Sequence, residues 1–149
     1  MPEAYLHRHR VTFDETNLVG NVYFAHFLHW QGHCREHFLA DHAPGVLGAL
    51  ADGLALVTVN CAVEFFGEGR AFDEIELRMS LDGLSGNRIA MRFDYLRTAP
   101  PPAELLAHGR QTVACMRRGG SGLEPTAIPD ELRGALAPFA PTAAAGGWS

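Results

Sequence analysis

Apolar residues recur at helical spacing in the stretch that begins near residue 22 and ends near residue 41. The stripe is made by Phe24, Phe27, Leu28, Cys34 and Phe38. This spacing places the side chains on one face of an α-helix, so we expect one long helix from about Val22 to Asp41. Gly20 and Asn21 supply the turn before it, and a shorter helical segment runs from Pro44 to a stop at Gly53.

From residue 54 onward apolar residues alternate with polar ones, which is typical of strands with one buried face. Four such segments are separated by turn-forming residues at 67–70, 82–87 and 98–103. The apolar faces expected for the four strands are, in order, Ala55, Val57, Val59, Cys61, Val63 and Phe65; Ile75, Leu77, Met79 and Leu81; Ile89, Met91, Phe93 and Tyr95; and Gly109, Val113 and Cys115. The other face is mixed polar, and we expect it to be solvated or packed against another subunit.

The order of elements is a strand ending near residue 11, a long helix and four long antiparallel strands. A sheet with a single apolar face needs a single cover, which the long helix can supply. We therefore predict an α+β protein with the hotdog fold, in which a five-stranded antiparallel sheet wraps around one central helix. Residues 1–149 should form one domain, with a loosely structured tail from about residue 119 whose only expected helix is a short one within 129–139.

The composition of the 149-residue chain, with 47% hydrophobic residues, is that of a globular protein. The net charge of −5 and the pI near 5.9 argue against a nucleic-acid-binding protein, although all twelve basic residues are arginine. No apolar run is long enough to span a membrane, and the N-terminus has no signal-peptide pattern. The three widely spaced cysteines are expected to be buried free thiols, so the chain is predicted to be cytoplasmic.

The loop before the long helix, DETNLVGNVYFAHF, resembles the signature of the 4-hydroxybenzoyl-CoA thioesterase family of hotdog proteins. The matching positions are Glu15, Asn17, Gly20, Val22, Tyr23, Phe24 and Phe27. In that family the second acid of the loop is the catalytic carboxylate, but this chain has Asn17 at that position. In this respect the chain is similar to the thioesterases of enediyne biosynthesis, and that resemblance implies that Asn17 and Arg35 act in catalysis.

Thioester hydrolysis needs a polarised carbonyl and an oriented water but little acid catalysis, because a thiolate is a good leaving group. The start of a helix offers unpaired N–H groups to an oxyanion, so we expect backbone donors near Tyr23 and Phe24, with Gly20 allowing the tight turn. Asn17 can orient the water or the carbonyl but cannot act as a base. The alternative is that Asn17 only forms an Asx turn before the helix.

Arg35 lies on the same helical stripe as Phe24, so its guanidinium should face the sheet. A buried arginine needs partners, and two arrangements are open. One is a structural ion pair with Glu64, and the other is an anchor that hydrogen-bonds Asn17 or the thioester oxygen.

Glu64 is also the candidate auxiliary acid, because it lies on the mixed face of the strand that carries Phe65. Some hotdog enzymes draw their catalytic acid from this region of the opposite subunit. The alternative is that Glu64 pairs across strands with Arg78 or Arg92.

Three aromatic residues, Phe27, Phe65 and Tyr95, are expected to line an apolar substrate channel between helix and sheet, although packing alone also explains them. Several arginines could meet the phosphate or the acidic surface of an acyl carrier: Arg70, Arg88, Arg97, Arg110, Arg117 and Arg118. Four helical histidines share the opposite face: His26, His29, His33 and His37. They lack the helical carboxylate of a zinc-protease motif, so we expect no metal and no cofactor.

The resemblance to the enediyne thioesterases implies a thioesterase that hydrolyses a polyenoyl β-ketoacyl thioester without a catalytic carboxylate. The resemblance implies that the acyl chain is linked through phosphopantetheine to the acyl carrier protein of an iterative enediyne-type polyketide synthase. It also implies a homo-oligomer, expected to be a dimer of dimers, with active sites at the dimer interface. The alternatives are an acyl-CoA thioesterase acting on an aryl or fatty acyl substrate and a non-catalytic acyl-binding hotdog protein.

Overall fold

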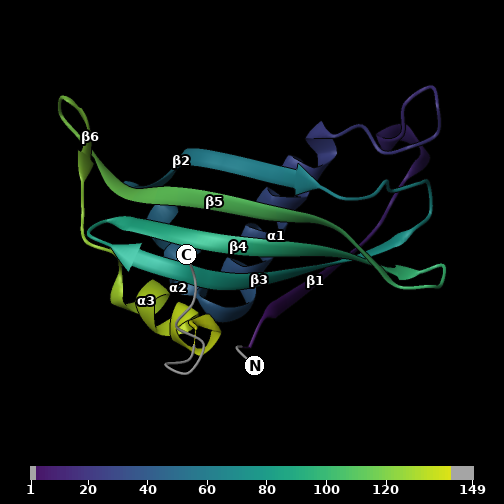
Figure 1. The fold of residues 1–149 in the computed structure, drawn as a ribbon. Helices are drawn as coiled ribbons and strands as arrows, with labels where there is room; N and C mark the ends of the chain where they lie inside the picture. The colour runs from purple at the N-terminus through teal and green to yellow at the C-terminus, as the bar shows by residue number, and fades with distance from the viewer. Residues whose placement is uncertain (1–2, 142–149) are drawn as a thin grey trace.

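A curved antiparallel sheet wraps around one long helix (Figure 1). The structure, a computed structural model, describes residues 3–141. Its elements are β1 (Tyr5–Arg10), the 3-10 turn η1 (Phe13–Glu15), α1 (Ala25–His42), α2 (Pro44–Leu50), β2 (Leu54–Phe65), β3 (Glu74–Ser85), β4 (Arg88–Ala99), β5 (Glu104–Gly119), β6 (Gly122–Pro125), α3 (Asp130–Leu136) and the 3-10 turn η2 (Ala137–Phe139). The strand order is β1-β3-β4-β5-β2, and β6 pairs with β5. The predicted α+β hotdog fold is confirmed, with β6 as an addition to the expected five strands.

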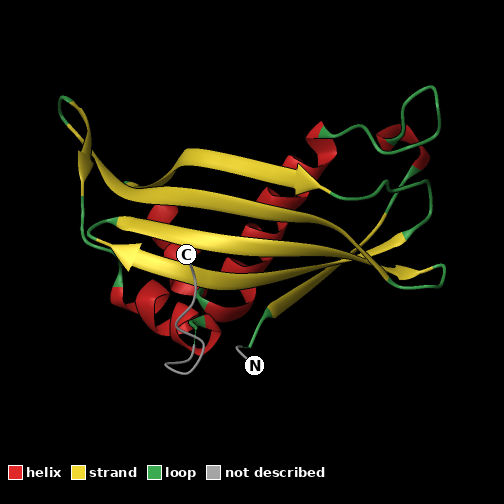
Figure 2. Ribbon diagram, in the orientation of Figure 1, coloured by secondary structure: helices red, strands yellow, loops and turns green. Residues whose placement is uncertain are grey.

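The hydrophobic core lies between α1 and the two central strands, β3 and β4. Every residue predicted for the apolar faces of these two strands is buried: Ile75, Leu77, Met79, Leu81, Ile89, Met91, Phe93 and Tyr95. Helix α1 contributes Phe27, Cys34 and Phe38 from the predicted stripe, together with Trp30, and each is at most 2% exposed. Phe24 also belongs to the predicted stripe, but it precedes the helix and is 58% exposed. Figure 2 shows the helix passing behind the sheet, so only one sheet face needs to be apolar.

Helix α1 begins at Ala25, three residues later than the predicted start at Val22. The backbone N–H of Val22 donates to the carbonyl of Gly69 at 2.7 Å, and Val22 also forms an isolated β-bridge with Thr16. Residues paired in this extended way cannot also be helical. The loop before the helix is therefore bound to the β2–β3 connection before the helix starts.

The predicted apolar face of β2 is wrong for its first half. The register with β5 shifts between Thr58 and Asn60, so Val59 is an extra, bulged residue. A bulge reverses the alternation of side chains, because the period of a strand is two residues. Before the bulge the even positions therefore face α1, and after it the odd positions do. Val57 and Val59 lie on the outer side of this edge strand and are 36% and 39% exposed.

The predicted loose tail from about residue 119 is also wrong for residues 122–139. The segment forms β6, the expected short helix α3, and a final 3-10 turn. Four of its side chains join the core cluster and are at most 5% exposed: Ile128, Leu132, Leu136 and Phe139. The ring of Phe139 packs edge-on against that of Phe38, with centroids 5.6 Å apart. The tail is ordered because it covers the end of the helix–sheet core; residues 142–149 lie outside the described range.

Candidate active site

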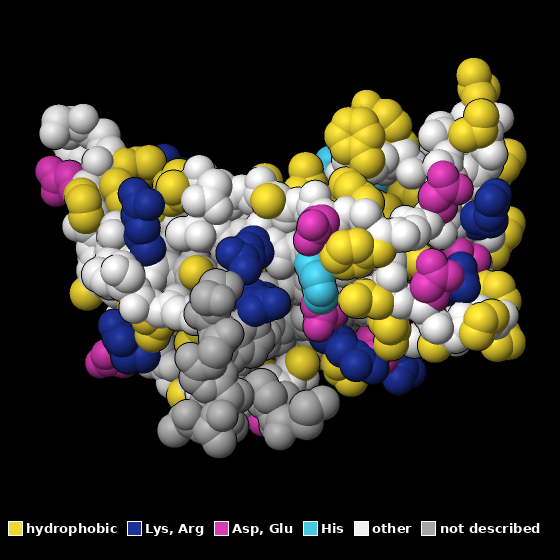
Figure 3. Space-filling model, in the orientation of Figure 1, with side chains coloured by type: hydrophobic (Ala, Val, Ile, Leu, Met, Phe, Trp, Pro, Cys, Tyr) yellow, Lys and Arg dark blue, Asp and Glu magenta, His cyan; other side chains and the backbone are white. Residues whose placement is uncertain are grey.

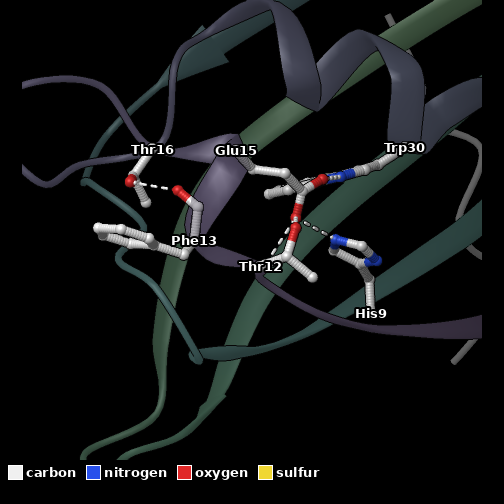
Figure 4. Close-up of polar contacts among 6 residues, drawn as sticks. All are labelled: His9, Thr12, Phe13, Glu15, Thr16 and Trp30. Carbon is white, nitrogen blue, oxygen red and sulfur yellow. Dashed lines mark hydrogen bonds and ion pairs between the residues drawn. The ribbon is translucent and has the colours of Figure 1, made fainter.

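Glu15 ties the loop before α1 to both β1 and α1 (Figure 4). One carboxylate oxygen accepts hydrogen bonds from His9 Nε2 at 2.7 Å and from the backbone N–H of Thr12 at 2.9 Å. The other oxygen accepts from Trp30 Nε1 at 2.8 Å. Burial alone would raise the pKa of Glu15, but these hydrogen bonds outweigh it and lower the pKa to about 2. Glu15 is therefore a fixed anion with a structural task.

Asn17 lies at the exposed tip of the same loop and forms an Asx turn. Its side-chain oxygen accepts from the backbone N–H of Val19 at 3.0 Å, and its carbonyl accepts from Gly20 at 3.0 Å. Gly20 has φ of +90°, a conformation that glycine adopts without strain, as expected for this turn. The carboxamide nitrogen of Asn17 donates to no group among residues 3–141, so its two N–H donors remain available to a ligand.

Of the two backbone N–H groups predicted to bind an oxyanion, one is already hydrogen-bonded and the other is not. The N–H of Tyr23 donates to the carbonyl of Glu15 at 3.0 Å and is therefore occupied. The N–H of Phe24 has no acceptor among the described residues, and no side chain caps α1. The free donor thus lies at the positive end of an 18-residue helix dipole.

Arg35 faces the sheet as predicted, but neither predicted partner is present. Its Nη1 donates to Gln111 Oε1 at 2.7 Å and more weakly to Thr58 Oγ1 at 3.4 Å. No ion pair with Glu64 and no hydrogen bond to Asn17 forms within residues 3–141. Burial lowers the pKa of Arg35 below its ordinary value, and the nearby Glu36 opposes that shift. The guanidinium stays charged near neutral pH, because arginine starts from a very high pKa.

Asn17 and Arg35 do not meet within one chain. Arg35 lies ten residues along α1 from Ala25, which is about 15 Å at 1.5 Å per residue. Asn17 precedes the helix and turns back on its own loop. Asn17 and Arg35 therefore have separate partners and make no hydrogen bond to each other within residues 3–141.

Glu64 lies on the outer face of the sheet, away from α1. It follows the bulge at an even position and pairs in register with His108. Together with Arg92, His108 and Arg110 it lines a hollow of about 230 Å³ on the face shown in Figure 3, where charged and histidine side chains gather near the middle of the sheet. The expected alternative partner Arg78 pairs instead with Glu76, at 2.8 Å. Glu64 is thus separated by the sheet from Arg35 of the same chain.

The aromatic residues expected to line a substrate channel pack against one another instead. The ring of Phe27 lies 5.0 Å from that of Phe65 and 5.1 Å from that of Tyr95, and the Tyr95 hydroxyl donates to the Phe27 carbonyl at 2.7 Å. Five hollows in residues 3–141, including the one beside Glu64, are lined by other residues.

The hollow beside the predicted catalytic arginine lies between α1, α2 and β2. This leucine groove has a volume of about 320 Å³ and is lined by Arg35, Glu36, Leu39, Leu47, Leu50 and Leu56. Sequence reasoning missed the groove, because its walls come from three elements. It also missed Gln111, although a polar residue between Gly109 and Val113 on the apolar face of β5 is a signal that could have identified it.

The remaining histidines and cysteines show no feature of a metal site or of a reactive thiol among the described residues. No group of three or more histidine, cysteine, aspartate or glutamate side chains within residues 3–141 could hold a metal ion. In the same range no helix is both long and apolar enough to cross a membrane. Cys34 and Cys115 are buried as expected, but Cys61 is exposed on the edge strand. Burial raises the pKa of the Cys34 thiol to about 12, which leaves it unreactive.

One of the arginines proposed to meet a carrier is engaged within the chain. Arg97 donates to Glu104 Oε1 at 3.1 Å and to the carbonyl of Pro102 at 3.1 Å. Arg70 forms a long, exposed ion pair with Glu68 at 3.8 Å, which contributes little. Exposed pairs of this kind leave the surface near residue 70 open to other anions.

Comparison with known proteins supports the expected family. The model of the thioesterase-like superfamily matches residues 11–136. None of the curated proteins compared with this chain is similar to it. Among solved structures, the dynemicin thioesterase is 72% identical, with a TM-score of 0.93 over 95% of this chain and 100% of that chain; its crystal structures reveal induced-fit and allosteric effects upon polyene binding.

More distant structures share the fold. A 1,4-dihydroxy-2-naphthoyl-CoA thioesterase from Synechocystis is 19% identical, with a TM-score of 0.77 over 90% of this chain and 96% of that chain. The 4-hydroxybenzoyl-CoA thioesterase from Pseudomonas sp. strain CBS-3 is 15% identical, with a TM-score of 0.77 over 89% and 99% of the two chains. At such low identity the likeness extends to the architecture alone.

Proposed function

The chain belongs to the thioesterase-like superfamily, and from that premise we propose that it hydrolyses a polyenoyl β-ketoacyl thioester in an enediyne-type polyketide pathway. The observation that carries this proposal is the 72% identity to the dynemicin thioesterase, at a TM-score of 0.93 over 95% of the chain. Identity at this level over 95% of the chain supports the same class of reaction. The substrate would be carried on phosphopantetheine by the acyl carrier protein of an iterative polyketide synthase.

The loop and the start of α1 support hydrolysis at the thioester carbonyl. The carbonyl oxygen would accept from the free N–H of Phe24, where the helix dipole favours a developing negative charge. The exposed carboxamide N–H groups of Asn17 would orient the carbonyl or the attacking water. The water oxygen bonds to the carbonyl carbon, the C–S bond breaks, and the leaving thiolate takes up a proton.

The reaction would use no catalytic carboxylate from this loop. The two oxygens of Glu15 are occupied by His9, Thr12 and Trp30, and its pKa of about 2 makes it a poor base. A β-keto substrate and a thiolate leaving group both lower the demand for a strong base. Glu64 remains a candidate auxiliary acid only if another subunit brings a substrate to the outer face of the sheet.

A dimer would complete the site. Strand β2 is a sheet edge with unpaired backbone groups and exposed Val57 and Val59, so it suits pairing with the same strand of a second copy. Such pairing would make one continuous sheet and would bring the Asn17 loop of one copy toward α1 of the other. Two such dimers would form the proposed dimer of dimers.

The proposed activity is tested by following free thiol release from a β-ketoacyl-carrier protein and from matched acyl-CoA esters. We expect the turnover of the carrier-linked substrate to be the faster of the two. Faster turnover of an aryl- or fatty acyl-CoA would make the chain an acyl-CoA thioesterase instead. Absence of thiol release from both, with tight acyl binding retained, would identify a non-catalytic acyl-binding protein.

A further inference from the structure

Arg35 is a half-buried cation that contacts only neutral acceptors. Its hydrogen-bond partners are the carboxamide oxygen of Gln111 and the hydroxyl of Thr58. Glu36 lies on the rim of the leucine groove, and its negative charge partly offsets the effect of burial on the pKa of Arg35. Neither Glu36 nor any other carboxylate among residues 3–141 forms an ion pair with Arg35. Placing a charge between helix and sheet without a counter-ion is costly, so the arrangement calls for an explanation.

Gln111 is itself hydrogen-bonded to a neutral group, the carboxamide of Gln31. It is 5% exposed, and its Nε2 donates to Gln31 Oε1 at 3.4 Å. Gln31 is fully buried, and its Nε2 donates to the carbonyl of Ala62 at 3.2 Å. Gly109 leaves the space that Gln31 occupies, since a Cβ there would collide with the Gln31 carboxamide. This chain of carboxamides fixes the oxygen that Arg35 contacts and adds no negative charge.

The cation lies beside a surface suited to an acyl chain. Only one guanidinium nitrogen of Arg35 is engaged, which leaves the other donors of the fork for a ligand. Four leucines of the leucine groove, Leu39, Leu47, Leu50 and Leu56, provide an apolar wall next to it. A cation at the end of an apolar groove is complementary to an anion carried on an apolar chain.

We propose that Gln111 is a positioning residue that holds Arg35 through a neutral carboxamide. The guanidinium, which has no ion-pair partner among residues 3–141, then receives the carboxylate of the released acid. The acyl chain of that acid lies along the leucine groove. The inference rests on the proposed thioesterase function, because hydrolysis creates a carboxylate at the end of an apolar chain. In the proposed dimer, the oxyanion that precedes the carboxylate would lie between the Phe24 N–H of one copy and Arg35 of the other. Replacing the neutral acceptor with a carboxylate would supply an internal counter-ion and remove the preference for anions.

The test compares the binding of decanoate with that of 1-decanol, by calorimetry, to the full-length protein and three variants. Gln111→Glu keeps the shape of the acceptor but adds the counter-ion, and Gln111→Met removes the acceptor. Thr112→Glu adds the same charge on the opposite face of β5 and is the matched control. We expect the wild type and Thr112→Glu to bind decanoate about tenfold more tightly than 1-decanol. Gln111→Glu should lose that preference while binding 1-decanol as the wild type does.

An unchanged preference for decanoate in Gln111→Glu would overturn the inference. Should that variant fail to fold, an unchanged preference in Gln111→Met would overturn it equally, because Arg35 would then need no positioning. Thiol release by the wild type, measured in parallel, separates the two proposals. Turnover without any preference for decanoate defeats the inference alone, and a preference for decanoate without turnover defeats the proposed function alone.

Discussion

The two ends of the candidate site hold their charged residues in opposite ways. At the loop, Glu15 is an anion that accepts hydrogen bonds from a histidine, an indole and a backbone N–H. Ten residues into α1, Arg35 is a cation that contacts only a carboxamide and a hydroxyl. The first charge is satisfied by the fold, whereas the second is held in place and left uncompensated.

The contrast separates a structural charge from one available to a substrate. A buried charge with all its hydrogen bonds made rigidifies the fold and has little left to offer a ligand. A positioned charge without a counter-ion can stabilise negative charge that develops during a reaction. Removal of Glu15 should therefore act mainly on stability, and removal of Arg35 mainly on rate.

The largest effect is expected for Arg35→Ala. We expect kcat for thiol release from the β-ketoacyl-carrier protein to fall about a hundredfold, because the guanidinium stabilises the developing anion. Arg35→Lys keeps the charge but loses the planar donors, so an intermediate loss is expected. Circular dichroism should show both variants folded. Wild-type rates in Arg35→Ala would refute the assignment of Arg35 to the site.

Glu15→Gln is expected to lower the free energy of unfolding by about 2 kcal/mol at pH 7, because His9 and Thr12 would face a group that donates as well as accepts. Urea denaturation measures this change. The folded pKa of about 2 lies below the ordinary 4.5, so the stability contributed by ionised Glu15 is present above about pH 4.5 and is lost as the pH falls toward 2. The difference between wild type and variant should shrink over that window, and a constant difference would contradict the assignment.

Asn17→Ala should lower kcat about tenfold, which corresponds to one lost orienting hydrogen bond of about 1.4 kcal/mol in the transition state. The unfolding free energy should change by less than about 1 kcal/mol, since the residue is exposed and its side chain accepts only one hydrogen bond, from Val19. Steady-state kinetics and urea denaturation are the two measurements. An unchanged kcat would show that Asn17 forms the Asx turn and has no role in the reaction.

The smallest effect is expected for Glu64→Ala. Because this residue lies across the sheet from Arg35 of its own chain, kcat should stay within about twofold of the wild-type value. The same thiol-release assay measures it beside Arg35→Ala. A loss of kcat as large as that of Arg35→Ala would place a catalytic acid on the outer face of the sheet.

The alternation of apolar residues predicted the inner faces of β3 and β4 and failed for the first half of β2. The central strands have a paired neighbour on each side and one helix over one face, so their alternation follows burial directly. Strand β2 is an edge with a bulge at Val59, and a single extra residue exchanges its two faces. No pattern in the sequence marks that residue, because the apolar–polar alternation of Val57, Thr58, Val59, Asn60 and Cys61 continues through it without a break.

The sequence identified the local features of the candidate site but not the contacts between residues that are distant in the chain. The loop signature identified Asn17, Gly20 and Phe24, since their tasks depend on a local turn and a helix start. The partner of Arg35 was predicted wrongly, because Gln111 lies 76 residues further along the chain. Two of the aromatic residues predicted to line a channel, Phe27 and Tyr95, are buried in the core, whereas Phe65 packs against Phe27 and is 45% exposed. The channel stays a prediction, since an aromatic residue in a sequence is equally consistent with packing and with substrate binding.

The sequence by itself determined the helix, the strands, the family and the inward direction of Arg35, because these depend on period and on short-range chemistry. The tertiary structure alone decided which charges are compensated. Glu15 is held by His9 of β1 and Trp30 of α1, together with Thr12 of its own loop. Arg35 is held by Thr58 of β2 and Gln111 of β5. Whether a charge is satisfied or available depends on those distant neighbours, and their arrangement is set by packing of the sheet around α1.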